Sequence, residues 1–366
     1  MALQIGIIGL PNVGKSTLFN VLTQAQNAEV ANYPFCTIEP NQAVVAVPDN
    51  RLDQLAELVQ VPKVIRTTIE FLDIAGLVQG ASKGEGLGNQ FLGHVRNTNA
   101  LLHVVRCFED SNVIHVSPDS DPEGDIRTVQ LELILADIEQ TDAKIEKLSR
   151  QSKGDRSLTY LLEMAEKTAA HLNSGKLLAS FPEREDPLFQ ELDHELRFLT
   201  AKPVIYAANI GEDYLASDHP SLQIIQSIAA ETNSPAVQIS ALIESELNSL
   251  DKEDRTDYME LSGIQESGLD KVIQTCYQML DLISFFTYNQ QEVRAWTVKK
   301  GVKAPRAAGQ IHSDFERGFI KAEVIPFDTF KSVGSMAAAR ESGKLRIEGK
   351  EYQVQDGDVI FFKFNV

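Results

Sequence analysis

The sequence predicts an α/β fold with an inserted helical hairpin, followed by a small α+β domain. Short buried-strand patterns alternate with helical segments up to residue 107, and the same pattern resumes at residue 203. Between these blocks, residues 127–200 show helical periodicity alone. After residue 282, short strands and short helices interleave, with turn signals between them. At 366 residues, the chain has room for two or three domains, each with its own core.

The first loop carries the clearest chemical signal. The segment GLPNVGKS, Gly9 to Ser16, matches the pattern G-x-x-x-x-G-K-[ST] and lies between a predicted strand, Leu3–Ile8, and a predicted helix that starts at Thr17. Glycine lets successive N–H groups turn toward a phosphate, and the helix N-terminus favours negative charge. Here Lys15 is expected to reach the β- and γ-phosphates, and the Ser16 hydroxyl to bind Mg²⁺. The segment therefore predicts a nucleoside triphosphate site.

Two later segments are typical of nucleotide-dependent switches. Thr37 lies in a proline-bracketed loop, at the distance from Lys15 at which such proteins close a threonine over Mg²⁺ and the γ-phosphate. A predicted strand, Thr67–Leu72, runs into Asp73-Ile74-Ala75-Gly76, a D-x-x-G element. Asp73 is expected to hold Mg²⁺ through water, and the Gly76 N–H to sense the γ-phosphate.

The residue after this element lacks the polar group that is expected to orient the attacking water. Leu77 stands where many GTPases of this class carry a glutamine that orients water, and an apolar side chain cannot do so. His115, just past the predicted strand Ala100–Cys107, is the candidate catalytic residue beside Lys15, because histidine donates and accepts protons near neutral pH. A packing or surface role for His115 is the alternative. His103, inside the strand, is expected to be a core histidine.

The motif that would select guanine is altered. Residues 127–200 read as an antiparallel helical hairpin or short coiled coil. After this insertion, a buried strand ends in Asn209-Ile210-Gly211-Glu212, at the place where guanine-specific proteins have the motif N-K-x-D. Glu212 is one methylene longer than Asp, so its oxygens miss the guanine N–H groups, and a carboxylate would meet an acceptor on adenine. Ile210 is expected to pack on a purine face. The loop Ser240-Ala241-Leu242 fits the last base-contacting segment.

Charge and composition limit the other functions. The net charge of −18 argues against a protein that coats nucleic acid with its whole surface. Residues 294–366, however, carry 13 Lys and Arg against 9 Asp and Glu, so this end is able to dock on RNA through Lys299, Lys300, Lys303 and Arg306. A solvated surface explains the same charges equally well.

Compartment and membrane expectations follow from the same composition. No run approaches 18 apolar residues, so no membrane span is expected. The N-terminal apolar run lacks a basic flank and leads into the phosphate loop, which indicates a core strand rather than a signal peptide. The 3 cysteines lie far apart without metal-binding spacing, as suits a reducing cytoplasm.

Together the motifs resemble a known family, the YchF/Obg-like ATPases, a branch of the Obg-related P-loop GTPases. The residues that carry the resemblance are GLPNVGKS, NYPFCTIEPN, DIAGLVQGASKGEGLGNQF, NIGE and a C-terminal stretch similar to a TGS domain of ubiquitin-like fold. The likeness covers essentially the whole chain. It implies an Obg-type nucleotide-binding domain over residues 1–281, with the helical insertion at about 127–200, and a TGS domain over residues 282–366.

The resemblance also implies site residues, residue by residue. Phosphate contacts fall on Asn12, Val13, Gly14, Lys15, Ser16, Thr17 and Gly76. Mg²⁺ contacts fall on Ser16, Thr37 and Asp73. Base contacts fall on Asn209, Ile210, Ser240, Ala241 and Leu242. In some related GTPases the residue at the position of Asn12 coordinates K⁺, which makes K⁺ a candidate second ion.

Two functional classes remain open from sequence. The first is a Mg²⁺-dependent ATPase switch, preferring ATP over GTP, whose hydrolysis drives a cycle on the ribosome. The second is a nucleotide-sensing binding module with vestigial hydrolysis, and a GTPase is a further alternative. The apolar Leu77 favours slow intrinsic turnover in either class. The expected partner is rRNA or a ribosomal protein, contacted by the TGS domain, the helical insertion or both, and a cytoplasmic monomer is expected.

Overall fold

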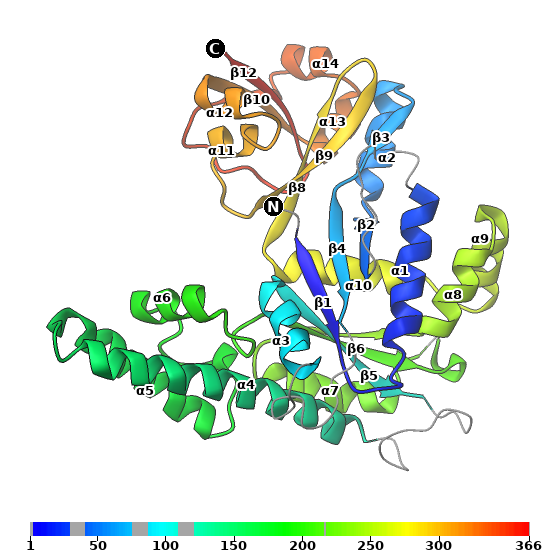
Figure 1. Ribbon diagram of the computed structural model, residues 1–366. Coiled ribbons are helices and arrows are strands. Elements are labelled where there is room, and N and C mark those ends of the chain that lie inside the picture. Colours follow the sequence, from blue (N-terminus) through cyan, green and yellow to red (C-terminus); the bar gives the residue numbers. More distant parts are fainter. Residues whose placement is uncertain (1–2, 30–40, 75–86, 109–120, 216, 366) are drawn as a thin grey trace. The chain divides into compact units, whose positions relative to one another are not determined.

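The computed structural model describes residues 3–29, 41–74, 87–108, 121–215 and 217–365 (Figure 1). The chain forms two compact units. The first comprises Met1–Ala28, Cys36–Val45 and Glu70–Val272, and the second comprises Glu29–Phe35, Ala46–Ile69 and Ile273–Val366. Thr37, Gly76, Leu77 and His115, which the sequence placed near the nucleotide, lie outside the described residues.

The first unit is built on a six-stranded sheet in the order β2-β4-β1-β5-β6-β7. The strands are β1 (Gln4–Ile8), β2 (Gln42–Ala46), β4 (Thr68–Asp73), β5 (Ala100–Cys107), β6 (Val204–Ile210) and β7 (Ala236–Ile239). β1 pairs with β4 and β5, β5 with β6, and β6 with β7, all in parallel. Parallel strands covered by helices on both faces are buried and mostly apolar, as in β5, where every residue is buried. This arrangement brings the carboxyl ends of β1, β4, β5 and β6 to one edge of the sheet.

The helices of this unit confirm the expected α/β class. They are α1 (Lys15–Glu29), α3 (Leu87–Asn97), α7 (Pro220–Ala230), α8 (Ala241–Ser249) and α9 (Lys252–Leu261), and α10 (Gly268–Met279) continues into the second unit. None of the described helices is long and apolar enough to cross a membrane.

The helical insertion is confirmed between β5 and β6. It comprises α4 (Pro122–Gln151), α5 (Thr159–Asn173) and α6 (Pro187–Leu196), which extend away from the sheet of the same unit (Figure 1). Its core is an apolar cluster that includes Leu148, Leu161 and Phe189, so the helices of the insertion pack against one another. Near the sheet, Ile126 of α4 belongs to a different cluster, which it shares with β5, β6 and α7.

The second unit has its own six-stranded sheet, in the order β11-β10-β12-β8-β9-β3. Its strands are β3 (Lys63–Ile65), β8 (Leu282–Tyr288), β9 (Glu292–Lys299), β10 (Phe319–Pro326), β11 (Arg346–Glu348) and β12 (Asp358–Phe364). Its helices are α2 (Asn50–Val59), α11 (Ala304–Ala308), α12 (Ser313–Arg317), α13 (Phe327–Val333) and α14 (Met336–Glu341). The sheet is mixed, since β12 pairs with β8 in parallel but with β10 in antiparallel. A small α+β domain was expected here, and the structure shows one.

The grouping of Ala46–Ile69 with this second unit differs from the division expected from sequence. β3 pairs with β9, with Lys63 opposite Glu292 and Val64 opposite Val293. Leu52 and Leu55 of α2 lie in the same apolar cluster as Phe286 and Phe330 of the C-terminal segment.

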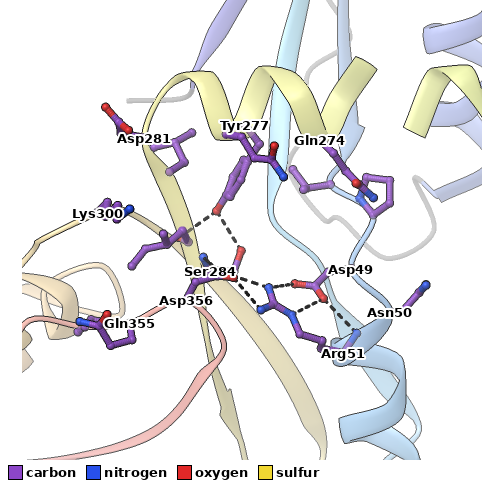
Figure 2. A pocket seen from close by; sticks show the side chains of 16 residues that line it. Asp49, Asn50, Arg51, Gln274, Tyr277, Asp281, Ser284, Lys300, Gln355 and Asp356 are labelled. Carbon is purple, nitrogen blue, oxygen red and sulfur yellow. Dashed lines mark hydrogen bonds and ion pairs between the residues drawn. The ribbon is translucent and has the colours of Figure 1, made fainter. Parts of the chain in front are cut away.

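An ion-pair network also joins this segment to the C-terminal part of its unit (Figure 2). Arg51 donates hydrogen bonds to Asp49 at 2.8 Å and to Asp356 at 2.7 Å, and these acidic neighbours raise the pKa of the guanidinium. Asp356 in turn accepts a bond from the Ser284 main-chain N–H at 2.9 Å. The network borders a polar cavity of about 510 Å³ lined within the second unit.

Candidate nucleotide site

The loop between β1 and α1 has the backbone that a phosphate-binding loop requires. Gly9 and Gly14 have φ of 148° and 97°, and Asn12 has φ of 62°. A Cβ at Gly9 would lie 2.5 Å from the Val104 carbonyl oxygen, and one at Gly14 would lie 2.1 Å from Nδ2 of Asn209. Both glycines are therefore required by close approach as well as by backbone conformation.

Lys15 is held inside this loop. Its side chain is 7% exposed, and Nζ donates a hydrogen bond to the Leu10 main-chain oxygen at 2.5 Å. Burial lowers the pKa of Lys15 to about 8, against the opposing effect of the Asp73 carboxylate. An ammonium that is buried this far gains most from an incoming anion, as phosphate oxygens would provide.

Asp73 lies at the carboxyl end of β4, next to the end of β1. It pairs in register with Ile7, and its N–H donates to the Asn41 carbonyl oxygen at 3.0 Å. Burial raises the pKa of Asp73, while Lys15 lowers it. Ser16 and Thr17, in the first turn of α1, are both exposed. The structure thus brings together three of the predicted residues, Lys15, Ser16 and Asp73, on adjoining elements.

His103 is a core residue, as the sequence indicated. It is 2% exposed and its ring lies 5.4 Å from the Tyr206 ring, between centroids. Burial lowers the pKa of His103 to about 3, with a further decrease from the Lys15 charge. The imidazole is therefore neutral at physiological pH and is not a proton carrier for the site.

Asn209 connects the base-side strand to the phosphate loop. It is 4% exposed; Nδ2 donates to the Val13 carbonyl oxygen at 2.9 Å, and Oδ1 accepts from the Ala241 N–H at 3.0 Å. One side chain thus fixes the phosphate loop against the start of α8. The sequence assigned Asn209 to base contact, and the contacts that the structure shows are with these two main-chain groups.

Ile210 does not lie as expected. It is 4% exposed and belongs to the apolar cluster with Cys107, Leu222 and Ile225. The expectation that its side chain packs on a purine face is therefore not supported, because that side chain faces the core. Glu212, two residues on, is exposed in a short 3₁₀ turn, Glu212–Tyr214.

The loop before α8 presents unpaired polar groups. Ser240 is 5% exposed, and its Oγ has no hydrogen-bond partner among the described residues. It occupies the N-cap position of α8, where the Ala241 N–H is bonded to Asn209 and the N–H groups that follow it in the first turn have no partner within the helix. Leu242, in the first turn, is 54% exposed. These groups are suited to hydrogen-bond with the edge of a nucleotide base.

Sequence reasoning missed a pair at the end of β5. Arg106 is 5% exposed and lies opposite Asn209 in the sheet. Its Nε donates to the Phe108 carbonyl oxygen at 3.2 Å, and its guanidinium lies 4.6 Å from the centre of the Phe108 ring. The available signal in the sequence was Arg106 itself, a charged residue inside a mostly apolar strand.

The four C-terminal cations are not equivalent. Lys303 pairs with Glu351 at 2.6 Å, and Arg306 pairs with Glu316 at 3.1 Å. Lys299 and Lys300 are exposed and make no ion pair with any described residue. Two of the four charges proposed for RNA docking are therefore already compensated.

Comparison with known proteins places the chain in a family. Residues 4–158 match the family described as "50S ribosome-binding GTPase", and residues 282–365 match the YchF GTPase C-terminal family, described as "Protein of unknown function (DUF933)". The "Ribosome-binding ATPase YchF" of Bacillus subtilis is 52% identical over 369 residues, and that of Escherichia coli O157:H7 is 48% identical over 368, each covering 100% of both chains. The solved structure of the Schizosaccharomyces pombe YchF GTPase has a TM-score of 0.85 and 36% identity, covering 99% of this chain and 97% of that one. The resemblance seen in the motifs is confirmed, and the chain belongs to the YchF family.

Proposed function

We propose that this chain is a Mg²⁺-dependent ATPase that prefers ATP over GTP and acts as a nucleotide switch on the ribosome. The observation that carries the proposal is the position of Lys15, buried in the phosphate loop and electrostatically coupled to Asp73. The names of its full-length relatives, which describe ribosome-binding ATPases, support the same activity.

The chain's own residues divide the work on the triphosphate. The loop N–H groups from Asn12 to Thr17 would cradle the phosphates, and Lys15 would balance their charge. Ser16 and Asp73, with Thr37, would hold Mg²⁺. The donors fit this ion, because a hydroxyl and one carboxylate leave coordination positions for phosphate and water. Burial disfavours the charged form of Asp73, and a divalent cation beside it would favour that form. When bound, Mg²⁺ supplies charge neutralisation on the phosphate oxygens.

The preference for adenine rests on the missing guanine contacts and on the hydrogen-bonding groups that the base site has in their place. Glu212 is exposed and Ile210 is buried, so neither reproduces the Lys and Asp of a guanine site. The Ser240 hydroxyl and the free N–H groups of α8 supply hydrogen bonds to a purine edge instead. Asn209 acts as a positioning residue, because it aligns this edge with the phosphate loop.

A comparison of ATP hydrolysis with and without purified ribosomes tests the proposal against a binding module whose hydrolysis is vestigial. Because Leu77 offers no polar atom to orient water, slow basal turnover and a large stimulation by ribosomes are expected. A chain that binds ribosomes and ATP without any stimulation would instead support the binding module. Faster hydrolysis of GTP than of ATP would support a GTPase.

A further inference from the structure

The far end of the helical insertion is basic, in a chain that is acidic overall. We define the hairpin tip as residues 147–160, the end of α4, the turn after it and the start of α5. It contains four Lys and Arg against one Asp, in a chain of net charge −18. Lys147, Arg150, Lys153 and Arg156 are all exposed.

The two acidic residues adjacent in sequence to these cations, Glu146 and Asp155, are already engaged. Glu146 pairs with Arg150. Asp155 accepts hydrogen bonds from the Ser157 N–H at 2.9 Å and the Ser157 hydroxyl at 2.7 Å, and so caps a short 3₁₀ turn, Arg156–Leu158. Lys147, Lys153 and Arg156 make no ion pair with any residue that the structure describes. Three cations thus remain uncompensated.

The tip is an ordered structure rather than a loose loop. Leu148 is 2% exposed and Leu161 is 6% exposed, and both belong to the core cluster of the insertion. Main-chain bonds from Gly154 and Asp155 to the Gln151 oxygen close the turn, at 3.0 Å and 3.1 Å. The cations are therefore presented from a fixed backbone, which lowers the entropic cost of binding.

The hairpin tip lies far along α4 from the part of that helix that is bonded to α3. Asp137 is the α4 residue that is bonded to Arg96 of α3, and the tip begins to close at Gln151, about 20 Å further along the helix at 1.5 Å per residue. The Debye length at physiological salt is about 8 Å. Screening therefore weakens the effect of acidic groups near the sheet, so the potential at the tip is set by the residues around it, which are four Lys and Arg against Glu146, Asp155 and Glu163.

We propose that the hairpin tip docks on the phosphate backbone of RNA. Lys147, Lys153 and Arg156 would contact phosphates, and Tyr160, which is 67% exposed at the start of α5, offers an aromatic face for an unpaired base. The proposal rests on the proposed function, since rRNA is the RNA that a ribosome-bound protein meets. It favours the tip over the C-terminal cations, two of which are paired within their own unit.

The test compares two triple variants with the same change in charge. The tip variant is Lys147→Gln, Lys153→Gln, Arg156→Gln, and the control is Lys344→Gln, Lys350→Gln, Lys363→Gln, three exposed lysines of the second unit. Co-sedimentation with ribosomes and filter binding to protein-free rRNA are measured over a range of salt. Loss of three phosphate contacts would weaken binding at least about tenfold at low salt and flatten the slope of log affinity against log salt by about 2.

Each outcome decides a separate point. Parent-like binding by the tip variant, or an equal loss in the control, would overturn the proposal. Weakened binding to ribosomes but unchanged binding to protein-free rRNA would assign the tip to a ribosomal protein and overturn the RNA contact. If the parent does not sediment with ribosomes, the proposed function fails, while the rRNA measurement still tests the tip. Unchanged basal ATP hydrolysis and unfolding midpoint show that the variant is folded.

Discussion

The side chain of Asn209 donates a hydrogen bond to the main-chain oxygen of Val13 at 2.9 Å, and so links the end of β6 to the phosphate loop. Gly14 allows this contact, because a Cβ there would lie 2.1 Å from the amide nitrogen. The same amide accepts from the Ala241 N–H, so phosphate loop and base loop are aligned by one buried residue. We therefore expect nucleotide affinity to depend on this contact, whichever base is bound.

Asn209→Asp tests this coupling. The carboxylate keeps the shape and the bond from Ala241 but cannot donate to Val13, and would face its oxygen. We expect affinity for ATP and GTP to fall together by about tenfold or more, with a loss of about 1–3 kcal/mol in the free energy of unfolding. Asn248→Asp is the matched control, since Asn248 donates to the Val21 oxygen at 3.1 Å. It should lower stability only, and a base-selective effect of Asn209→Asp would contradict the coupling.

Ser240→Ala tests the base edge. Because Oγ of Ser240 has no partner among the described residues, its removal should leave the free energy of unfolding nearly unchanged. If the hydroxyl contacts the base, ATP affinity should fall by about fivefold to tenfold, or ~1 kcal/mol. Ser249→Ala, at the other end of α8, is the control: its exposed hydroxyl donates to the Glu246 main-chain oxygen, so its loss should cost little stability and leave ATP affinity unchanged. Unchanged ATP affinity in a titration calorimeter would remove Ser240 from the site.

The pH dependence of ATP binding should report Lys15. Its pKa in the free protein is about 8, and bound phosphate must raise that pKa, because it favours the charged form. Binding therefore takes up a proton above pH 8, and affinity should fall by about fivefold between pH 8 and pH 9. Lys202, whose pKa burial also lowers to about 8, lies away from the phosphate loop, and Lys202→Gln should keep this profile. A flat profile in the parent would show that Lys15 is charged throughout.

The buried ion pair between α3 and α4 should dominate the stability of the insertion. Asp137 is fully buried and accepts bonds from Arg96 at 3.0 Å, the Leu199 N–H at 3.1 Å and the Thr200 N–H at 2.8 Å. Asp137→Asn leaves the Arg96 charge without its partner, and we expect a loss of about 3–5 kcal/mol by urea unfolding. The double variant Arg96→Met, Asp137→Leu should lose less free energy of unfolding than the two single variants, Arg96→Met and Asp137→Leu, lose in sum. Additive losses would show that the two side chains do not act as a pair.

The sequence predicted local structure well where a short pattern carries its own chemistry. GLPNVGKS between an apolar strand and a helix was sufficient to place Lys15 and Ser16 at the start of a helix, and Asp73 lies at the end of β4 as expected. Local signals also explain two breaks between helices in the C-terminal domain. The short helices expected after residue 282 are more numerous than continuous helical patterns suggest: Gly334, with φ of 79°, separates α13 from α14, and residues 309–312 separate α11 from α12.

Contacts between segments far apart in the chain could not be predicted from local sequence patterns. β3 is three residues long with an exposed lysine, and only its pairing with β9 shows that it belongs with the C-terminal sheet. β8 is the neighbour of β12 and β9 in that sheet, and its place there depends on pairing with segments that lie further along the chain. The burial of Ile210 depends on its packing against Leu222 and Ile225, which no local pattern reveals.

A titration of the parent protein with ATP and with GTP, in the presence of Mg²⁺, tests the central claim most directly. Because the base site lacks the Lys and Asp of a guanine site, ATP should bind at least about tenfold more tightly than GTP, a difference of ~1.4 kcal/mol. The same titration without Mg²⁺ should show weaker binding of ATP, since Ser16 and Asp73 would no longer hold the ion that links them to the phosphates. Equal affinities for the two nucleotides, or tighter binding of GTP, would contradict the account.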